Sequence, residues 1–236
     1  MSTISTPHRP MPSGNGLPLL ANGDRMKQPE FHRRYLAYPD DVKFELIGGI
    51  VYMASPLRYP HGAFSQLLSG VFCLYAAATP GVEGADNATT ILGEESEPQP
   101  DLALRLLPEY GGQSHVGEDE YLRGAPELLA EVAYSSRAID LNQKREDYER
   151  AGVKEYLVLS LEEGQLHWFD FTENRMIRPN RQGVSCSVVL PGLWIDNEAL
   201  VARDSPRVIE VAQKGLASRA HAAFVKRLQA ARRKHS

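Results

Sequence analysis

The sequence predicts an α/β fold in which a mixed β-sheet is flanked by helices. Short apolar runs bounded by turn residues alternate with stretches of helical period along the 236 residues. Apolar residues make up 42% of the chain, which is enough to bury a sizeable core. We therefore expect one large domain over residues 25–204, with a tail at each end.

The first 24 residues lack any hydrophobic periodicity. They are rich in Pro, Gly, Ser and Asn, and their prolines interrupt any regular helix. We expect residues 1–24 to be a disordered leader. No stretch here or elsewhere has the apolar length of a signal peptide or a membrane span, so a cytoplasmic location without membrane contact is expected.

The N-terminal half of the domain is expected to contain two helices and a hairpin. A helix over 30–38 precedes two strands, 44–47 and 50–53, which flank a Gly-Gly turn. A helix over 61–78 has a broad apolar face and ends at a Pro-Gly pair. The remaining strands of this half are expected at 82–86, 89–92 and 101–106.

The C-terminal half begins with two buried strands joined by a helix. Strand 128–134 leads to a helix over 140–151, which stops at Gly152, and strand 155–160 follows. Later elements are expected as a hairpin over 165–171 and 175–179, a strand over 184–190, and a basic helix or tail over 205–236. No acid follows Glu210, so this tail presents either a solvated helix face or an arm that contacts phosphates.

Composition and missing motifs exclude several function classes. The formal net charge of -4 gives no overall attraction to nucleic acid, so such binding would need a local basic patch. The two cysteines, Cys73 and Cys186, form neither a zinc motif nor a disulfide framework and are expected to be packing residues in a reducing compartment. The chain has no P-loop, dinucleotide-binding, zinc-protease or serine-hydrolase signature.

Two acids stand in runs that are otherwise apolar. Asp101 opens Leu-Ala-Leu, and Glu131 lies within Leu-Leu-Ala-Glu-Val-Ala, on the strand face of Leu129 and Ala133. A buried carboxylate is costly unless it is paired or holds a metal. Hard cations such as Mg²⁺ prefer a few carboxylates, waters and phosphate oxygens, so the two acids together indicate a metal site. The alternatives are a turn aspartate and an edge-strand glutamate that faces water.

Lys144 is the third candidate, because it lies on the helix that follows Glu131. A helix that returns across the sheet could point its ammonium back at the two acids. The alternative is an ordinary exposed lysine, paired with Asp147 or Tyr148 one turn further on.

The order of these motifs resembles a known family. Similar motifs in the same order occur in the Uma-type restriction endonuclease family, which belongs to the PD-(D/E)XK nuclease superfamily. The motif residues here are Pro100-Asp101, Ala125-Pro126-Glu127, Glu131-Val132, Ser135-Ser136, Lys144, Tyr148, Gly152-Val153 and Glu155-Tyr156. Upstream, residues 44–49 and Pro60-His61 also resemble the family, and the similarity covers roughly residues 30–171.

The resemblance implies a restriction endonuclease-like mixed β-sheet flanked by helices, with an extra C-terminal β-hairpin and helix. It also implies hydrolysis of DNA phosphodiester bonds with Mg²⁺, or Mn²⁺, held by Asp101 and Glu131. Lys144 would be catalytic. In the superfamily the lysine stands two residues after the glutamate, where this chain has Ala133, and Lys144 on the following helix is the matching position.

Three further side chains are candidates for the same site. Glu45 would be catalytic, through a metal-bound water or a second ion, unless it is a surface glutamate of its hairpin. His61 would contact the scissile phosphate or cap its helix, and we favour the cap. Tyr148 would bind substrate.

DNA is the expected partner, and a homodimer is expected because two symmetry-related sites cut two strands most easily. The main alternative is a non-catalytic module of nuclease fold that binds nucleic acid or a protein partner. A weaker one is a hydrolase of small phosphate esters.

Overall fold

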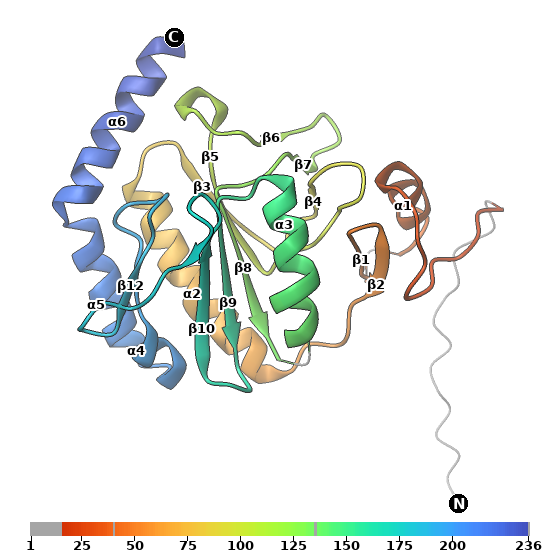
Figure 1. Cartoon of the computed structure of the whole chain (residues 1–236). Helices are drawn as coiled ribbons and strands as arrows, with labels where there is room; N and C mark the ends of the chain where they lie inside the picture. Colours follow the sequence, from red (N-terminus) through yellow and green to blue (C-terminus); the bar gives the residue numbers. More distant parts are fainter. Residues whose placement is uncertain (1–15, 40, 135, 236) are drawn as a thin grey trace, which may run out of the picture.

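The centre of the protein is a six-stranded mixed sheet (Figure 1). The computed structural model describes residues 16–39, 41–134 and 136–235. In spatial order the strands are β11 (Arg175–Met176), β10 (Gln165–Asp170), β9 (Glu155–Ser160), β8 (Leu128–Ala133), β5 (Leu102–Leu106) and β3 (Val82–Asp86). The β8–β9 pair is parallel and the other neighbours are antiparallel, which confirms the predicted mixed sheet.

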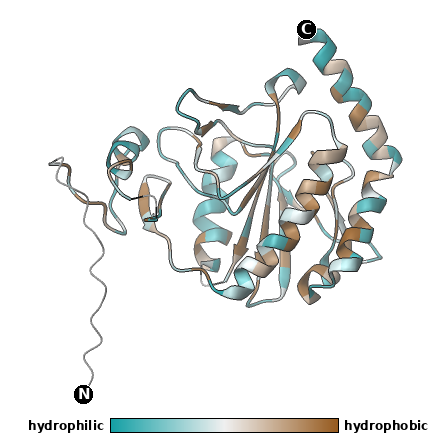
Figure 2. Ribbon diagram, turned by 180° about the vertical axis from the view of Figure 1, so that it is seen from behind, coloured by the Kyte–Doolittle hydropathy of each residue, from teal (hydrophilic) through white to brown (hydrophobic). Residues whose placement is uncertain are grey.

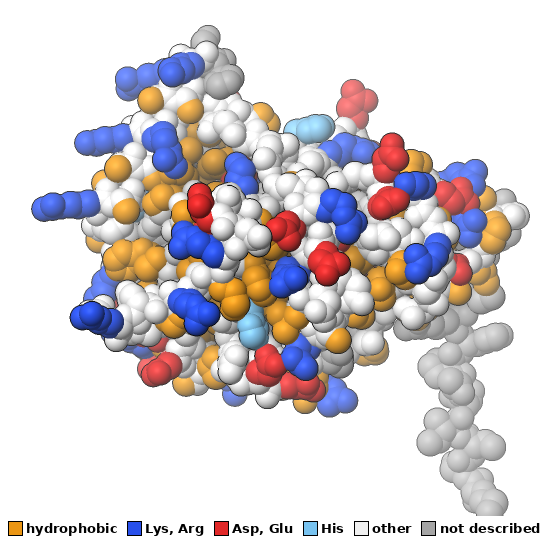
Figure 3. All heavy atoms as spheres, in the orientation of Figure 1, with side chains coloured by type: hydrophobic (Ala, Val, Ile, Leu, Met, Phe, Trp, Pro, Cys, Tyr) orange, Lys and Arg blue, Asp and Glu red, His pale blue; other side chains and the backbone are white. Residues whose placement is uncertain are grey.

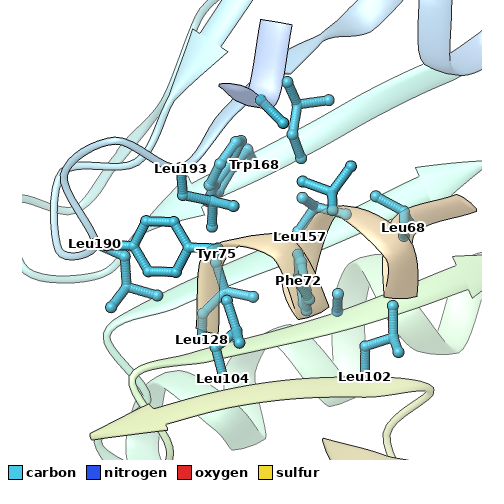
Figure 4. Packing of buried hydrophobic residues seen from close by; sticks show 14 of the residues in the cluster. Leu68, Phe72, Tyr75, Leu102, Leu104, Leu128, Leu157, Trp168, Leu190 and Leu193 are labelled. Atoms are coloured by element: carbon cyan, nitrogen blue, oxygen red, sulfur yellow. The ribbon is translucent and has the colours of Figure 1, made fainter. Parts of the chain in front are cut away.

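Helices cover both faces of this sheet. On one side lies α2 (Tyr59–Ala78) with the C-terminal helices α4 (Asn197–Ala202), α5 (Ser205–Leu216) and α6 (Arg219–His235). On the other side lies α3 (Arg145–Ala151). Apolar segments follow the strands at the centre of the molecule (Figure 2). The main core lies between α2 and the sheet, where Leu68, Phe72 and Tyr75 meet Leu104 and Leu128 (Figure 4).

Strand β8 is buried on both faces, as predicted. Its residues Leu128, Ala130 and Val132 belong to the main core beneath α2, whereas Leu129 and Ala133 pack under α3. Because side chains alternate along a strand, Glu131 points to the α3 side. It is therefore the single ionisable side chain of a six-residue strand at the middle of the sheet.

A smaller unit precedes the sheet. Helix α1 (Gln28–Tyr35) packs on the predicted hairpin of β1 (Phe44–Ile47) and β2 (Ile50–Met53), whose two turn glycines have φ of +55° and +77°. Leu20 is buried in the same cluster, so residues 16–24 of the predicted leader belong to this unit. Residues 1–15 of that leader lie outside the described residues.

Other boundaries differ from the prediction because the elements are too short to show a period. The predicted strand 89–92 is reduced to β4 (Thr90–Ile91), which forms a small sheet with β6 (His115–Val116) and β7 (Leu122–Arg123). A 3₁₀ turn, Pro108–Tyr110, lies between β5 and β6 in the sequence. The predicted strand 184–190 stops early: β12 (Val184–Cys186) pairs with β13 (Trp194–Asp196). Cys73 is exposed, so its prediction as a packing residue is wrong.

The predicted basic C-terminal segment is two packed helices. His221, Phe224 and Leu228 of α6 are buried at helical spacing, so this helix has a fixed orientation on the body. Its cations project outward in the upper left of the space-filling view (Figure 3). No helix within the described residues is long and apolar enough to cross a membrane.

Candidate active site

The site forms where β5 and β8 separate. Their ladder ends at the pair Leu102 and Ala130. One step further, the backbone N–H of Val132 donates to Asp101 Oδ2 at 2.7 Å instead of to a strand carbonyl. The backbone N–H of Asp101 in turn lies 3.4 Å from Glu131 Oε2. The end of the ladder thus brings the two predicted acids together.

Lys144 reaches these acids from the helix that follows β8, and not from β8 itself, where Ala133 stands two residues after Glu131. Its Nζ lies 2.9 Å from Glu131 Oε1 and 3.0 Å from Glu45 Oε1, and the residue is only 5% exposed. The alternative of an ordinary exposed lysine is therefore wrong. Ala133 is fully buried under α3.

Lys144 is the last residue of a π-helical turn, η2 (Ile139–Lys144), which leads directly into α3. The sequence pattern predicted one regular helix here. A π-helical turn has i→i+5 hydrogen bonds and is common at functional sites. Asp140, Lys144 and Tyr148, each four residues apart, are all buried and approach the acids.

Tyr148 contacts Glu131 within the protein interior. It is fully buried, and its hydroxyl donates to Glu131 Oε1 at 3.0 Å. Tyr148 does not line the cleft beside Glu131, and its expected contact with substrate stays a prediction.

Asp140 was missed by the sequence analysis. Its carboxylate accepts a hydrogen bond from Ser136 Oγ at 2.5 Å and lies 3.8 Å from Lys144 Nζ. The available signal was its spacing of four residues from Lys144, on the same helix face.

His61 and Glu45 also approach the centre. His61 is in the first turn of α2, but its side chain does not cap that helix, so the favoured interpretation as a cap is wrong. Its Nε2 lies 3.0 Å from Asp101 Oδ2, and this hydrogen bond raises the pKa of the imidazole. Glu45 is half-buried and accepts the backbone N–H of Gln99 at 2.8 Å, beside its contact with Lys144.

The electrostatics of the site favour a cation. Burial raises the pKa of Glu131 well above its ordinary range, and the nearby Asp101 adds to this, although Lys144 opposes it. Burial also raises the pKa of Asp140. For Lys144, burial lowers the pKa, but the surrounding carboxylates outweigh it, so the ammonium stays charged. One lysine thus faces more carboxylates than it can neutralise, which makes the centre receptive to a further positive charge.

A cleft of about 360 Å³ opens above these groups. Asp101, Glu131, Lys144 and Asp140 lie at its floor, and the segment between β2 and α2 forms one wall. The site is therefore recessed but open to solvent.

The chain is similar to known proteins in sequence and in fold. Residues 29–198 match the Uma2 family, described as "Putative restriction endonuclease", and the chain belongs to this family. The fold is similar to the crystal structure of "a putative nuclease belonging to DUF820" from Anabaena variabilis, with a TM-score of 0.56 and 12% identity over 72% of this chain and 97% of that chain. No curated protein matches the chain. Family and fold together support a nuclease, and α5 and α6 lie beyond the matched residues.

Proposed function

We propose that this protein is a divalent-metal-dependent endonuclease that hydrolyses DNA phosphodiester bonds. The observation that carries the proposal is the convergence of Asp101, Glu131 and Lys144, from three separate elements, at the floor of one cleft.

The donor set suits Mg²⁺, with Mn²⁺ as the second candidate. Within the described residues no three His, Cys, Asp or Glu side chains gather as a metal-binding group, so the protein offers a pair of carboxylates. Mg²⁺ commonly binds through one or two carboxylates and completes its shell with water and substrate phosphate. Asp101 Oδ2 is engaged by Val132 and His61, which leaves Oδ1 for a metal. Such an ion supplies a bound water of lowered pKa and neutralises phosphate charge.

The protein's own groups then have separate tasks. Lys144 keeps a positive charge beside Glu131, where it orients the attacking water and stabilises charge on the phosphorane oxygens. Glu45 and Asp140 hold the ammonium of Lys144 in place. Tyr148 fixes Glu131, and His61 fixes Asp101.

The surface of α6 supports DNA as the substrate. After Glu210 the chain contains seven Lys and Arg and no acid, although its overall charge is -4. Cations held at fixed positions attract the phosphate backbone without reading sequence. Charge-neutralising changes at the exposed Lys226, Arg233 and Lys234 should reduce the salt dependence of DNA binding, whereas unchanged dependence would remove α6 from the interface.

The direct test is plasmid cleavage in Mg²⁺. Wild type should nick supercoiled DNA, and Asp101→Asn and Lys144→Met should nick it far more slowly. Asp86→Asn is the matched control, because Asp86 is an exposed aspartate at the end of the neighbouring β3. Equal nicking by all four proteins would refute the assignment.

A non-catalytic module of the same fold is the second candidate. The observation that favours it is that Lys144 already occupies Glu131 Oε1, an oxygen of an expected metal ligand. Calorimetry distinguishes the two: DNA binding without any Mg²⁺ or Mn²⁺ binding would identify the module.

A further inference from the structure

The side chains on the wall of the cleft differ in charge and polarity from those on its floor. The floor carries buried acids, whereas the linker between β2 and α2 forms a wall over residues 54–58 that contains no acid. On this linker Leu57 is 64% exposed, and the adjoining Tyr59 is 83% exposed. Large apolar side chains are here presented to solvent beside a charged centre.

Arg58 extends this wall to the end of β8. Its guanidinium lies 5.3 Å from the ring centroid of Tyr134, and both residues line the cleft. Tyr134 follows β8 directly and stands three positions after Glu131. The wall therefore combines flat π surface and positive charge next to the expected metal ligands. Aromatic and guanidinium faces are the groups on which unpaired nucleobases stack.

The depth of the site limits which form of DNA can reach it. Asp101, Glu131 and Lys144 are each 5–7% exposed, and the cleft volume of about 360 Å³ is that of a small-ligand site. In a regular duplex each phosphate stays on a strand held to its complement. A single strand is narrower and more flexible than a duplex, so it brings a phosphodiester to this floor more readily, and its unpaired bases are free to stack on the wall.

On the basis of the proposed function, we infer that the cleft takes an unpaired DNA strand. The linker wall, defined as Leu57, Arg58 and Tyr134, which line the cleft, together with the adjoining and exposed Tyr59, stacks on nucleobases next to the scissile phosphate. The apolar and aromatic side chains pack against the bases, and the guanidinium of Arg58 binds an adjacent phosphate. The competing occupant of this exposed apolar surface is a second copy of the chain, as in a dimer.

The test compares one labelled oligonucleotide as a single strand and as a perfect duplex. Binding is measured by fluorescence anisotropy with Ca²⁺ in place of Mg²⁺, cleavage is measured in Mg²⁺, and oligomeric state is measured by sedimentation. The variant is Leu57→Ser/Tyr59→Ser. The control is Leu36→Ser/Val116→Ser, which changes two apolar side chains that are also exposed, by 60% and 53%, and do not line the cleft.

Wild type should prefer the single strand by about tenfold or more in binding and cleavage. The linker-wall variant should lose about tenfold in single-strand affinity, with duplex affinity unchanged, and the control should match wild type. Equal cleavage of both substrates, or full single-strand affinity in the linker-wall variant, would overturn the inference and leave the proposed nuclease function intact.

Two other outcomes separate the remaining possibilities. If the variant dissociates a dimer and keeps the single-strand preference, the wall is an interface between copies and the inference is overturned. If wild type prefers the single strand, the variant loses that preference, and no substrate is cleaved, the nucleobase wall is supported and the nuclease function fails.

Discussion

Two buried glutamates on neighbouring strands differ in how their charge is accommodated. Glu155, at the start of β9, accepts hydrogen bonds from Trp168 Nε1, Ser187 Oγ and the backbone N–H groups of Val188 and Val189, at 2.7–3.0 Å. Glu131, on β8, is contacted on Oε1 by Lys144 and Tyr148, but the donor to its Oε2 is a backbone N–H 3.4 Å away. Both are buried, and burial raises the pKa of both.

The difference shows that burial alone does not mark a catalytic acid. Glu155 is saturated by four neutral donors, three from the loop after β12 and one from β10, so it anchors that loop and has no lone pairs to offer. Glu131 borders a cleft, is paired with a cation and keeps an oxygen weakly engaged. The type of donor and the access to solvent separate a structural carboxylate from a metal ligand.

The largest expected effect is on catalysis at Glu131. Glu131→Gln should lower DNA cleavage in Mg²⁺ by about 1000-fold or more, because a metal ligand and its charge stabilisation are lost. Its thermal unfolding should stay close to that of wild type, since the amide can still accept from Lys144 and Tyr148. Wild-type cleavage by this variant would show that Glu131 is structural, like Glu155.

Glu155→Ala should give the opposite result. Removing the carboxylate leaves several buried donors unpaired, and we expect a loss of about 3 kcal/mol in the free energy of unfolding, measured by urea denaturation. Cleavage per folded molecule should not change. Glu173→Ala, at an exposed glutamate after β10, is the control and should have no effect on either property. A selective loss of cleavage in a stable Glu155→Ala protein would contradict the comparison.

Lys144→Met should reduce cleavage by about 100-fold, because the ammonium stabilises charge in the transition state. Mg²⁺ affinity, measured by calorimetry, should be retained or increased, since no ammonium then competes for Glu131. If Mg²⁺ affinity and cleavage were lost together, Lys144 would have a role in assembling the metal site.

A smaller effect is expected from pH. The raised pKa of Glu131 means that a proton occupies this carboxylate more readily than its ordinary value of 4.5 implies. A metal must displace that proton, so Mg²⁺ affinity should rise with pH until the pKa is passed, by up to about tenfold per pH unit. Glu155→Gln should leave this slope unchanged, whereas Glu131→Gln should abolish it. A slope that persists in Glu131→Gln would assign the proton to another group.

The sequence predicted the strand faces well, because alternation in β8 and the Gly-Gly turn of the hairpin are local properties. The approach of Lys144 to the acids was expected from the resemblance, with an exposed lysine as the alternative, and the structure shows its contact with Glu131. The small sheet of β4, β6 and β7 was beyond prediction, since strands of two residues have no period.

The roles of single side chains were harder to predict. His61 was expected to cap its helix. Its contact is with Asp101, which is positioned by the end of the β5–β8 ladder, and that contact is not visible in the sequence. Glu131 and Glu155 look alike in sequence, as acids beside apolar strand residues. Three of the four donors of Glu155 lie on a loop more than 30 residues away, and no local pattern indicates them.

Anomalous diffraction from a crystal soaked with Mn²⁺ shows directly whether Asp101 and Glu131 hold a divalent metal beside Lys144. We predict a peak at the floor of the cleft, in contact with the carboxylates of Asp101 and Glu131, that is absent in Glu131→Gln crystals. Cleavage-competent protein that shows a Mn²⁺ peak elsewhere, or the same peak in Glu131→Gln crystals, would contradict the account.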